Sequence, residues 1–238
     1  MSGMGGLVNT TQKYYGTTCV LYGCNRARRS GHRYCPIHKN RLLFRGHPEQ
    51  ELISKATSIF AINAVKLLAE ENKSNPSWVE LMSAIEERWN GAILRVNTEL
   101  NRCNDGTARI RTYYRGLQIC YDIFHNLGME QAFNVYCSWQ WLQESDPKLF
   151  VNEDAFKHQM IRSLRNKAKS FRGRHLRSDG SSFAHLVPLY MAERAVVWEV
   201  ITGIFGITGM LLHRQIDARA ERLKTNKERI YAAIKHIK

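Results

Sequence analysis

The first 48 residues of this 238-residue chain contain no acidic side chain; the first one along the sequence is Glu49. A second acid-free stretch runs from residue 157 to residue 177. Together the two stretches hold the basic residues Lys13, Arg26, Arg28, Arg29, Arg33, Lys39, Arg41, Arg45, Lys157, Arg162, Arg165, Lys167, Lys169, Arg172, Arg174 and Arg177. The whole chain has 35 Lys and Arg against 21 Asp and Glu, a formal net charge of +14, which predicts a polyanionic partner. A merely solvated basic surface is the alternative.

The sequence also lacks a long apolar run and a secretory leader. Residues 195–212 are the most apolar segment, but they include Glu199 and three glycines and fall short of the roughly 20 apolar residues of a spanning helix. We expect this segment in a protein core, and no membrane partner. Residues 1–11 have no basic start followed by an apolar run, so we expect a reducing, cytoplasmic location, in a host cell if the chain is phage-encoded.

Strand patterns and internal repeats are scarce, and helical periodicity dominates, so we expect a mainly α fold. The expected domains are a flexible lead at 1–14, a Cys3His zinc module at 15–47, and a basic all-helical domain at 48–238 with a possible subdivision near 145–152. Inside that domain, the spacing of apolar residues and cap signals predicts helices at 49–72, from about 76 to 104, at 107–126, at 129–144, from 153 and near 214–236. Residues 173–181 read as a polar loop.

Local signals also predict one helix cap and one apolar helix face. Asn152 is expected to cap the helix from 153, with Glu153 and Asp154 in its first turn. In residues 49–72 the apolar face is expected to be formed by Leu52, Ile53, Ala56, Ile59, Phe60, Asn63, Leu67 and Leu68.

Four potential metal ligands lie within 20 residues, with the spacing C-x4-C-x10-C-x2-H: Cys19, Cys24, Cys35 and His38. Two close pairs joined by a short connector favour a closed tetrahedral zinc site, and thiolate with imidazole ligands select zinc in a reducing cell. Gly23 and Gly31 supply the tight turns. The alternative, four unrelated residues in a short window, is the weaker interpretation.

The stretch from Cys19 to Pro48, with Gly31, Cys35-Pro-Ile-His38 and Gly46-His-Pro48, resembles the short zinc module of phage and bacterial HNH homing endonucleases and related phage DNA-binding proteins. The resemblance covers about 30 residues. It implies those four ligands, a basic helix bearing Lys39, Arg41 and Arg45, and binding of DNA. The chain departs from that pattern in the two residues His32-Arg33 and in lacking an HNH catalytic motif, so cleavage is not implied.

Three functions remain open from the sequence. We expect a zinc-dependent protein that binds nucleic acid, DNA in preference to RNA, of phage or mobile-element origin. Its backbone contacts are expected from Arg26, Arg28, Arg29, Arg33, Lys39, Arg41, Arg45, Arg162, Arg165, Lys169, Arg172 and Arg174. A nuclease is the second hypothesis, with His175, Asp179 and His185 as candidate catalytic residues around the polar loop, although polar loop residues are a commoner explanation. A structural or partner-binding protein stapled by zinc is the third.

Overall fold

The computed structural model describes residues 18–29, 31–104, 111–170, 172–176, 182–206, 208–209, 211–212, 214–219, 221–222 and 225. The proposed flexible lead at 1–14 lies outside them. The helices are α1 (Pro36–Arg45), α2 (Lys55–Asn72), α3 (Pro76–Asn104), α4 (Arg111–Leu127), α5 (Met129–Ser145), the short 3-10 helix η2 (Pro147–Leu149), α6 (Glu153–Lys167) and α7 (Met191–Phe205). The mainly α class is thus confirmed.

The helix boundaries follow local chemistry that is visible in the sequence. Asn152 caps α6 by accepting a hydrogen bond from the backbone N–H of Ala155 at 2.9 Å, as expected. Pro76 opens α3, where its fixed φ suits the first turn. The predicted start of α2 at residue 49 is wrong, because Ser54 caps that helix and accepts from Thr57 N–H at 3.0 Å.

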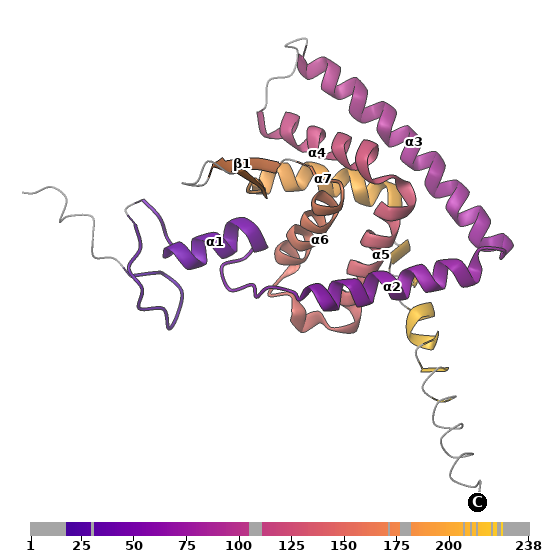
Figure 1. The fold of residues 1–238 in the computed structure, drawn as a ribbon, viewed down its shortest axis with the longest axis horizontal. Helices are drawn as coiled ribbons and strands as arrows, with labels where there is room; N and C mark the ends of the chain where they lie inside the picture. The colour runs from indigo at the N-terminus through magenta and orange to yellow at the C-terminus, as the bar shows by residue number, and fades with distance from the viewer. Residues whose placement is uncertain are drawn as a thin grey trace, which may run out of the picture.

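Helix α5 forms the centre of the helical body. Every residue from Ala132 to Leu142 is buried, so this helix is covered on all sides. Helix α2 packs against it from one side, α6 packs against another part of it, and α4 packs against α7 (Figure 1). The rings of Trp89, Phe124, Phe133, Tyr136 and Phe205 meet in this core, and full burial of each such ring stabilises the fold by about 1.5–3 kcal/mol.

Helix α2 buries a different face from the one its periodicity indicated. The buried side chains are Ala61, Ile62, Val65 and Leu68, whereas Phe60 is 65% exposed. Apolar residues occur nearly all round this helix, so their spacing alone does not identify one buried stripe. The small Ala61 and Val65 allow close packing, and the predicted face is corrected accordingly.

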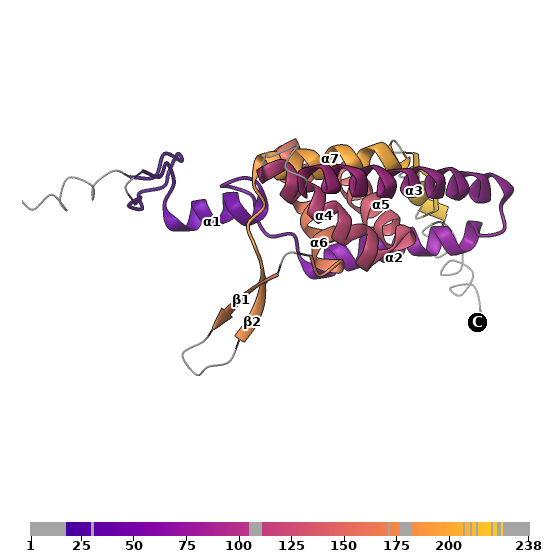
Figure 2. The ribbon, with the colours of Figure 1, turned by 90° about the horizontal axis from the view of Figure 1, so that it is seen from above.

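Two strands correct the expected all-helical domain at 48–238 and the first part, 173–176, of the expected polar loop at 173–181, whose remaining residues lie outside those that the structure describes. Strands β1 (Arg172–Leu176) and β2 (Ser182–Leu186) pair antiparallel, with His175 opposite Phe183 and Gly173 opposite His185. The sequence between the strands includes Asp179-Gly180, a pair typical of hairpin turns. This pair was the available sequence signal for a hairpin. The hairpin projects from the helical body near the end that carries α1 (Figure 2).

The apolar segment at 195–212 takes the place expected for it in the core. Its part within α7 buries Val197, Val200, Ile201, Ile204 and Phe205. No helix among the described residues is long and apolar enough to cross a membrane. Nine further described positions, within 214–225, are helical, in agreement with the predicted C-terminal helix as far as they reach.

Candidate metal centre

The first two ligands of the candidate metal centre lie on a tight loop. The backbone N–H of Cys19 donates to the Arg26 carbonyl at 2.9 Å, which brings the two ends of the loop together. Within it, the N–H of Cys24 donates to the Leu21 carbonyl at 3.1 Å. Gly23 has a φ of 74°, a left-handed conformation that favours glycine. Both thiols therefore face one point despite lying five positions apart.

The other two ligands lie where the chain enters α1. Cys35 is the N-cap residue, Pro36 opens the helix, and His38 falls in its first turn. Cys35 and His38 are three positions apart, a spacing that brings them to neighbouring places on a helix. A backbone hydrogen bond from Val20 to the Arg33 carbonyl, 3.2 Å long, ties the first loop to this second element.

The ligand atoms of Cys19, Cys24, Cys35 and His38 all lie within 4.8 Å of one another. The Nδ1 atom of His38 is 3.3 Å from the Cys19 Sγ and 3.4 Å from the Cys35 Sγ. Tetrahedral zinc, with bonds of about 2.0–2.3 Å, holds its ligand atoms about 3.3–3.8 Å apart. The four residues thus form a Cys3His group that could hold a metal ion such as zinc. Four protein ligands complete a tetrahedron, which is the arrangement of a structural rather than a catalytic zinc site.

The charge state of Cys19 also suits metal binding. Burial opposes ionisation of this thiol, but hydrogen bonds from the Cys35 and Leu21 backbone and from the His38 and Cys24 side chains outweigh it. Together they lower the pKa of Cys19 to about 6. The thiolate is the form that ligates metals, so part of the cost of deprotonation is met by the fold itself. A hydrogen bond from the Arg26 backbone lowers the pKa of Cys24, but burial and the neighbouring Cys19 and Cys35 thiols outweigh it, so that the pKa of Cys24 is raised. Burial also raises the pKa of the core thiols Cys120 and Cys137, which lie away from the cluster.

Three arginines of the metal module are exposed at its surface: Arg26, Arg29 and Arg33. Among the described residues, none of their guanidinium groups has an ion-pair or hydrogen-bond partner. Three thiolates and one zinc ion carry about one net negative charge. Three exposed arginines exceed that charge, so part of their field is directed at solvent.

The remaining basic residues of the predicted DNA-contacting set in this module have partners. Arg41 and Arg45 form ion pairs with Glu51, at 2.8 Å and 3.4 Å. Arg28 donates to a backbone carbonyl of the connector at 2.9 Å. Lys39 lies 2.9 Å from an imidazole nitrogen of the same connector. These side chains help to hold the module in shape, which leaves Arg26, Arg29 and Arg33 as the cations of the module without a partner among the described residues.

Two side chains of helix α6 donate hydrogen bonds to the C-terminal end of α1. Arg162 donates from Nη1 to the Phe44 carbonyl at 3.1 Å, and Gln159 donates from Nε2 to the Arg45 carbonyl at 3.1 Å. The last carbonyls of a helix have no partner within it and carry partial negative charge. A cation and an amide from α6 supply that partner, so the module is joined to the body by polar contacts as well as packing.

Gly46 and His158 complete this joint. Gly46 ends α1 with a φ of 85°, and a Cβ atom there would lie 2.4 Å from the Cβ of His158. His158 is 3% exposed. Its burial, together with the nearby charges of Arg194, Arg162 and Arg165, lowers the pKa of His158 to about 3. This imidazole is therefore neutral at pH 7.

The expected array of phosphate-binding cations on α6 requires correction. Arg165 is only 2% exposed, and its Nη2 donates to the Val187 carbonyl at 3.1 Å. Burial lowers its pKa to about 10, which still leaves it charged at pH 7. Arg162 is half-buried, and its guanidinium already donates to the Phe44 carbonyl at the end of α1. Lys169 is exposed, in agreement with the expectation, while the side chains of Arg172 and Arg174 lie outside what the structure describes.

The candidate catalytic residues stay untested. His175 and His185 are on β1 and β2, where only the backbone is described, and Asp179 lies outside the described residues. The only group of at least three His, Cys, Asp or Glu able to hold a metal within the described ranges is the Cys3His cluster. No arrangement of these three side chains among the described residues supports the hypothesis of a nuclease.

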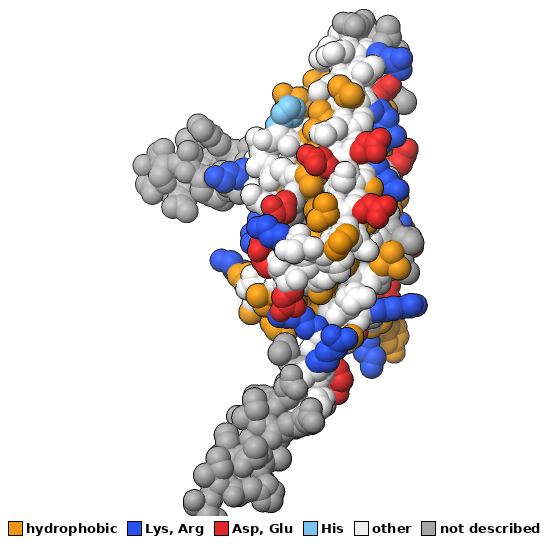
Figure 3. Space-filling view, turned by 90° about the vertical axis from the view of Figure 1, so that its right-hand side faces the viewer, with side chains coloured by type: hydrophobic (Ala, Val, Ile, Leu, Met, Phe, Trp, Pro, Cys, Tyr) orange, Lys and Arg blue, Asp and Glu red, His pale blue; other side chains and the backbone are white. Residues whose placement is uncertain are grey.

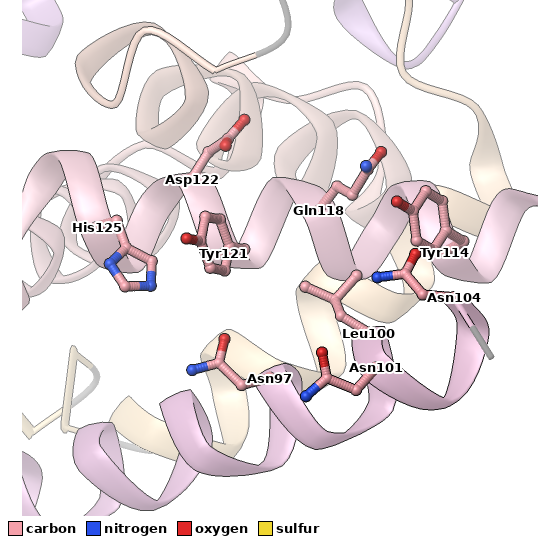
Figure 4. A pocket seen from close by; sticks show the side chains of 9 residues that line it. All are labelled: Asn97, Leu100, Asn101, Asn104, Tyr114, Gln118, Tyr121, Asp122 and His125. Carbon is pink, nitrogen blue, oxygen red and sulfur yellow. The ribbon is translucent and has the colours of Figure 1, made fainter.

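A polar cleft between α3 and α4 was not foreseen from the sequence. It has a volume of about 640 Å³, and its walls include Asn97, Asn101 and Asn104 from α3 and Gln118 and His125 from α4 (Figure 4). The three asparagines are four and three positions apart, which places them on one face of their helix. That spacing was the available signal. Among the described residues, no Lys or Arg lines the cleft.

No model of a known protein family matches the chain, and neither a curated protein sequence nor a solved structure is found to resemble it. The chain is therefore described by its own geometry: a mainly α protein with an N-terminal Cys3His group able to hold a metal ion.

Proposed function

We propose that the chain is a zinc-dependent nucleic-acid-binding protein, with DNA as the preferred polymer, in which the metal centre holds three exposed arginines in a fixed arrangement. The observation that carries the proposal is the position of Arg26, Arg29 and Arg33. All three are exposed on short segments tied to the ligand cluster, and no carboxylate occurs in the sequence before Glu49. Phosphate groups are the natural partners of such arginines, because the guanidinium fork matches two phosphate oxygens.

The opposite side of the molecule supports this assignment by contrast. The face of the helical body turned away from the module mixes acidic, basic and apolar side chains (Figure 3). Such interspersed charge is typical of a solvated surface. The one-sided charge is a property of the module, and it supports contact with a polyanion there.

The proposal is tested by measuring binding to labelled duplex and single-stranded DNA and RNA at several salt concentrations. Each lost phosphate contact lowers the slope of log K against log salt by about 0.9 on duplex DNA. Replacement of Arg26, Arg29 and Arg33 by Ala should therefore flatten the slope by about 2–3 units and weaken binding to all sequences.

A matched control removes the same charge elsewhere. Lys66, Arg88 and Lys148 are exposed on the body, and their replacement by Ala also lowers the net charge by three. This control should retain most of the affinity and slope. Equal losses in the two triple variants, or no salt-sensitive binding by the parent protein, would contradict the proposal. The second result would favour a structural or partner-binding protein stapled by zinc.

A further inference from the structure

We infer that the cavity between the metal module's connector and α1 is a subsite for one unstacked nucleotide, which holds the phosphate near Arg29 and Lys39 and the base against Tyr34 and Asn40. The inference rests on the proposed function and adds a ligand class and a location to it. The cavity has a volume of about 350 Å³, at the lower end of the roughly 300–1,000 Å³ of small-ligand sites.

Two of the residues that line the cavity are cations suited to an anion. Arg29 is exposed and has no partner among the described residues. Lys39 is held in place because its Nζ lies 2.9 Å from the Nε2 of His32, which leaves further N–H groups of the ammonium for a ligand. The connector that carries His32 is itself anchored, since Arg28 donates to the His32 carbonyl at 2.9 Å. The described residues that line this cavity include no carboxylate.

Other lining residues of the cavity are suited to a flat polar ring. Tyr34 is half-buried and offers an aromatic surface, and Leu43 adds an apolar contact. Asn40 is exposed and carries both donors and an acceptor on its amide, the combination that reads the edge of a base. A phosphate ion alone would use only the cations. A ligand that uses both kinds of lining residue needs an anionic group and a planar heterocycle, which is the chemistry of a nucleotide.

The metal centre fixes the relative position of the two walls. Tyr34 directly precedes Cys35, and Lys39 and Asn40 follow His38, so each wall is within two residues of a ligand. Bases are available to such a pocket only when they are unpaired or extruded from a duplex. The subsite therefore predicts a preference for single-stranded over fully paired DNA of the same sequence.

The experiment compares Tyr34→Leu with Tyr22→Leu, because Tyr22 is a fully exposed tyrosine of the same module outside the cavity. A second pair is Asn40→Ala with Asn25→Ala, both at exposed positions. Full-length proteins are first shown to hold the parent amount of zinc. Affinity is then measured for a labelled single-stranded 20-mer, for its duplex, and for dAMP and inorganic phosphate.

We expect Tyr34→Leu to weaken single-stranded binding by between about 5-fold and about 100-fold, the loss typical of one base–aromatic stack. The salt slope should not change, because no charge is removed. Asn40→Ala should cause a smaller loss, and the Tyr22 and Asn25 variants should bind as the parent does. The parent should bind dAMP more tightly than phosphate.

Two results would overturn the subsite. One is equal affinity of the Tyr34→Leu and Tyr22→Leu proteins for single-stranded DNA and dAMP at parent zinc content. The other is equal binding of dAMP and inorganic phosphate. Either result leaves the proposed function standing if the Arg26, Arg29 and Arg33 variant still loses salt-dependent binding. Failure of the proposed function is recognised separately, by the absence of salt-sensitive polynucleotide binding in the parent.

Discussion

The two acid-free basic stretches look alike in sequence but have different roles in the structure. Around the metal centre, Arg26, Arg29 and Arg33 are exposed and lack partners among the described residues. On α6, Arg165 is buried and Arg162 is half-buried, and both donate to backbone carbonyls. The difference follows from what lies beneath each segment. The module has almost no core in which to bury a long side chain, whereas α6 lies between α1, α5 and α7.

This comparison shows that a run of basic residues does not by itself define a binding surface. An arginine can satisfy the open carbonyls of a neighbouring helix or loop as well as it can meet a phosphate. Variants of each group of residues distinguish the two roles.

Removal of the metal should affect the module far more than the body. The module depends on its ligands, and structural zinc contributes about 10–16 kcal/mol to the folding of comparable small units. Cys35→Ser, or chelation of the parent protein, should abolish zinc binding and expose the amides of residues 18–45 to hydrogen exchange, while α5 stays protected. Cys103→Ser, which alters a half-buried thiol outside the cluster, serves as the control. Retention of one zinc ion by Cys35→Ser would contradict this role.

Loss of Arg165 should destabilise the body. Its guanidinium is buried near the buried carboxylate of Glu193, which also pairs with Arg115 at 3.1 Å. Arg165→Met takes a cation away from the buried Glu193 carboxylate and leaves the Val187 carbonyl without its donor, which should lower the free energy of unfolding by about 3 kcal/mol in urea titrations. Lys167→Met, at an exposed position of the same helix, should change it by less than about 0.5 kcal/mol. Similar values for the two variants would place Arg165 in a surface role.

Acid should weaken the joint between α1 and α6 through His158. The pKa of this imidazole is about 3 in the folded protein and about 6.5 in the unfolded chain. As the pH falls below about 6.5, His158 becomes protonated in the unfolded chain but stays neutral in the folded protein. The free energy of unfolding, which has its full value above that pH, therefore falls by up to about 1.4 kcal/mol per pH unit. In His158→Gln this component should disappear, so the parent's stability should fall more steeply with acid.

The free energy of unfolding measured from pH 7.5 to pH 5 checks this prediction. His125→Gln, which changes an exposed imidazole, controls for the loss of a histidine. Parallel curves for the parent and His158→Gln proteins would contradict it, because they would show that His158 takes up a proton as readily in the folded protein as in the unfolded chain.

Local signals were enough to predict much of this fold. The cap residue Asn152, the helix start at Pro76 and the spacing of the four metal ligands each depend on residues close together in the sequence. The same is true of the central stripe on α3, where Ile85, Trp89 and Val96 lie at helical spacing and are buried. Such features are readable because their partners lie within one or two helical turns.

Other features depend on partners far away in the sequence. The burial of Arg165 requires Val187, and the role of Arg162 requires Phe44, which is 118 positions away. Nothing in the pattern of α6 distinguishes a phosphate contact from a helix-capping contact. The buried face of α2 is likewise determined by which side meets α5.

We propose that cations of the module contact the polyanion, whereas those of α6 donate to backbone carbonyls and stabilise the fold. A matched pair of variants distinguishes these two roles. Arg29→Gln and Arg162→Gln each remove one charge, and Gln at position 162 keeps a donor for the Phe44 carbonyl. Both proteins are titrated with the same duplex DNA over a range of salt concentrations. The account predicts that Arg29→Gln flattens the salt slope by about 0.9, while Arg162→Gln keeps the parent slope. An equal change in both, or a change confined to Arg162→Gln, would contradict it.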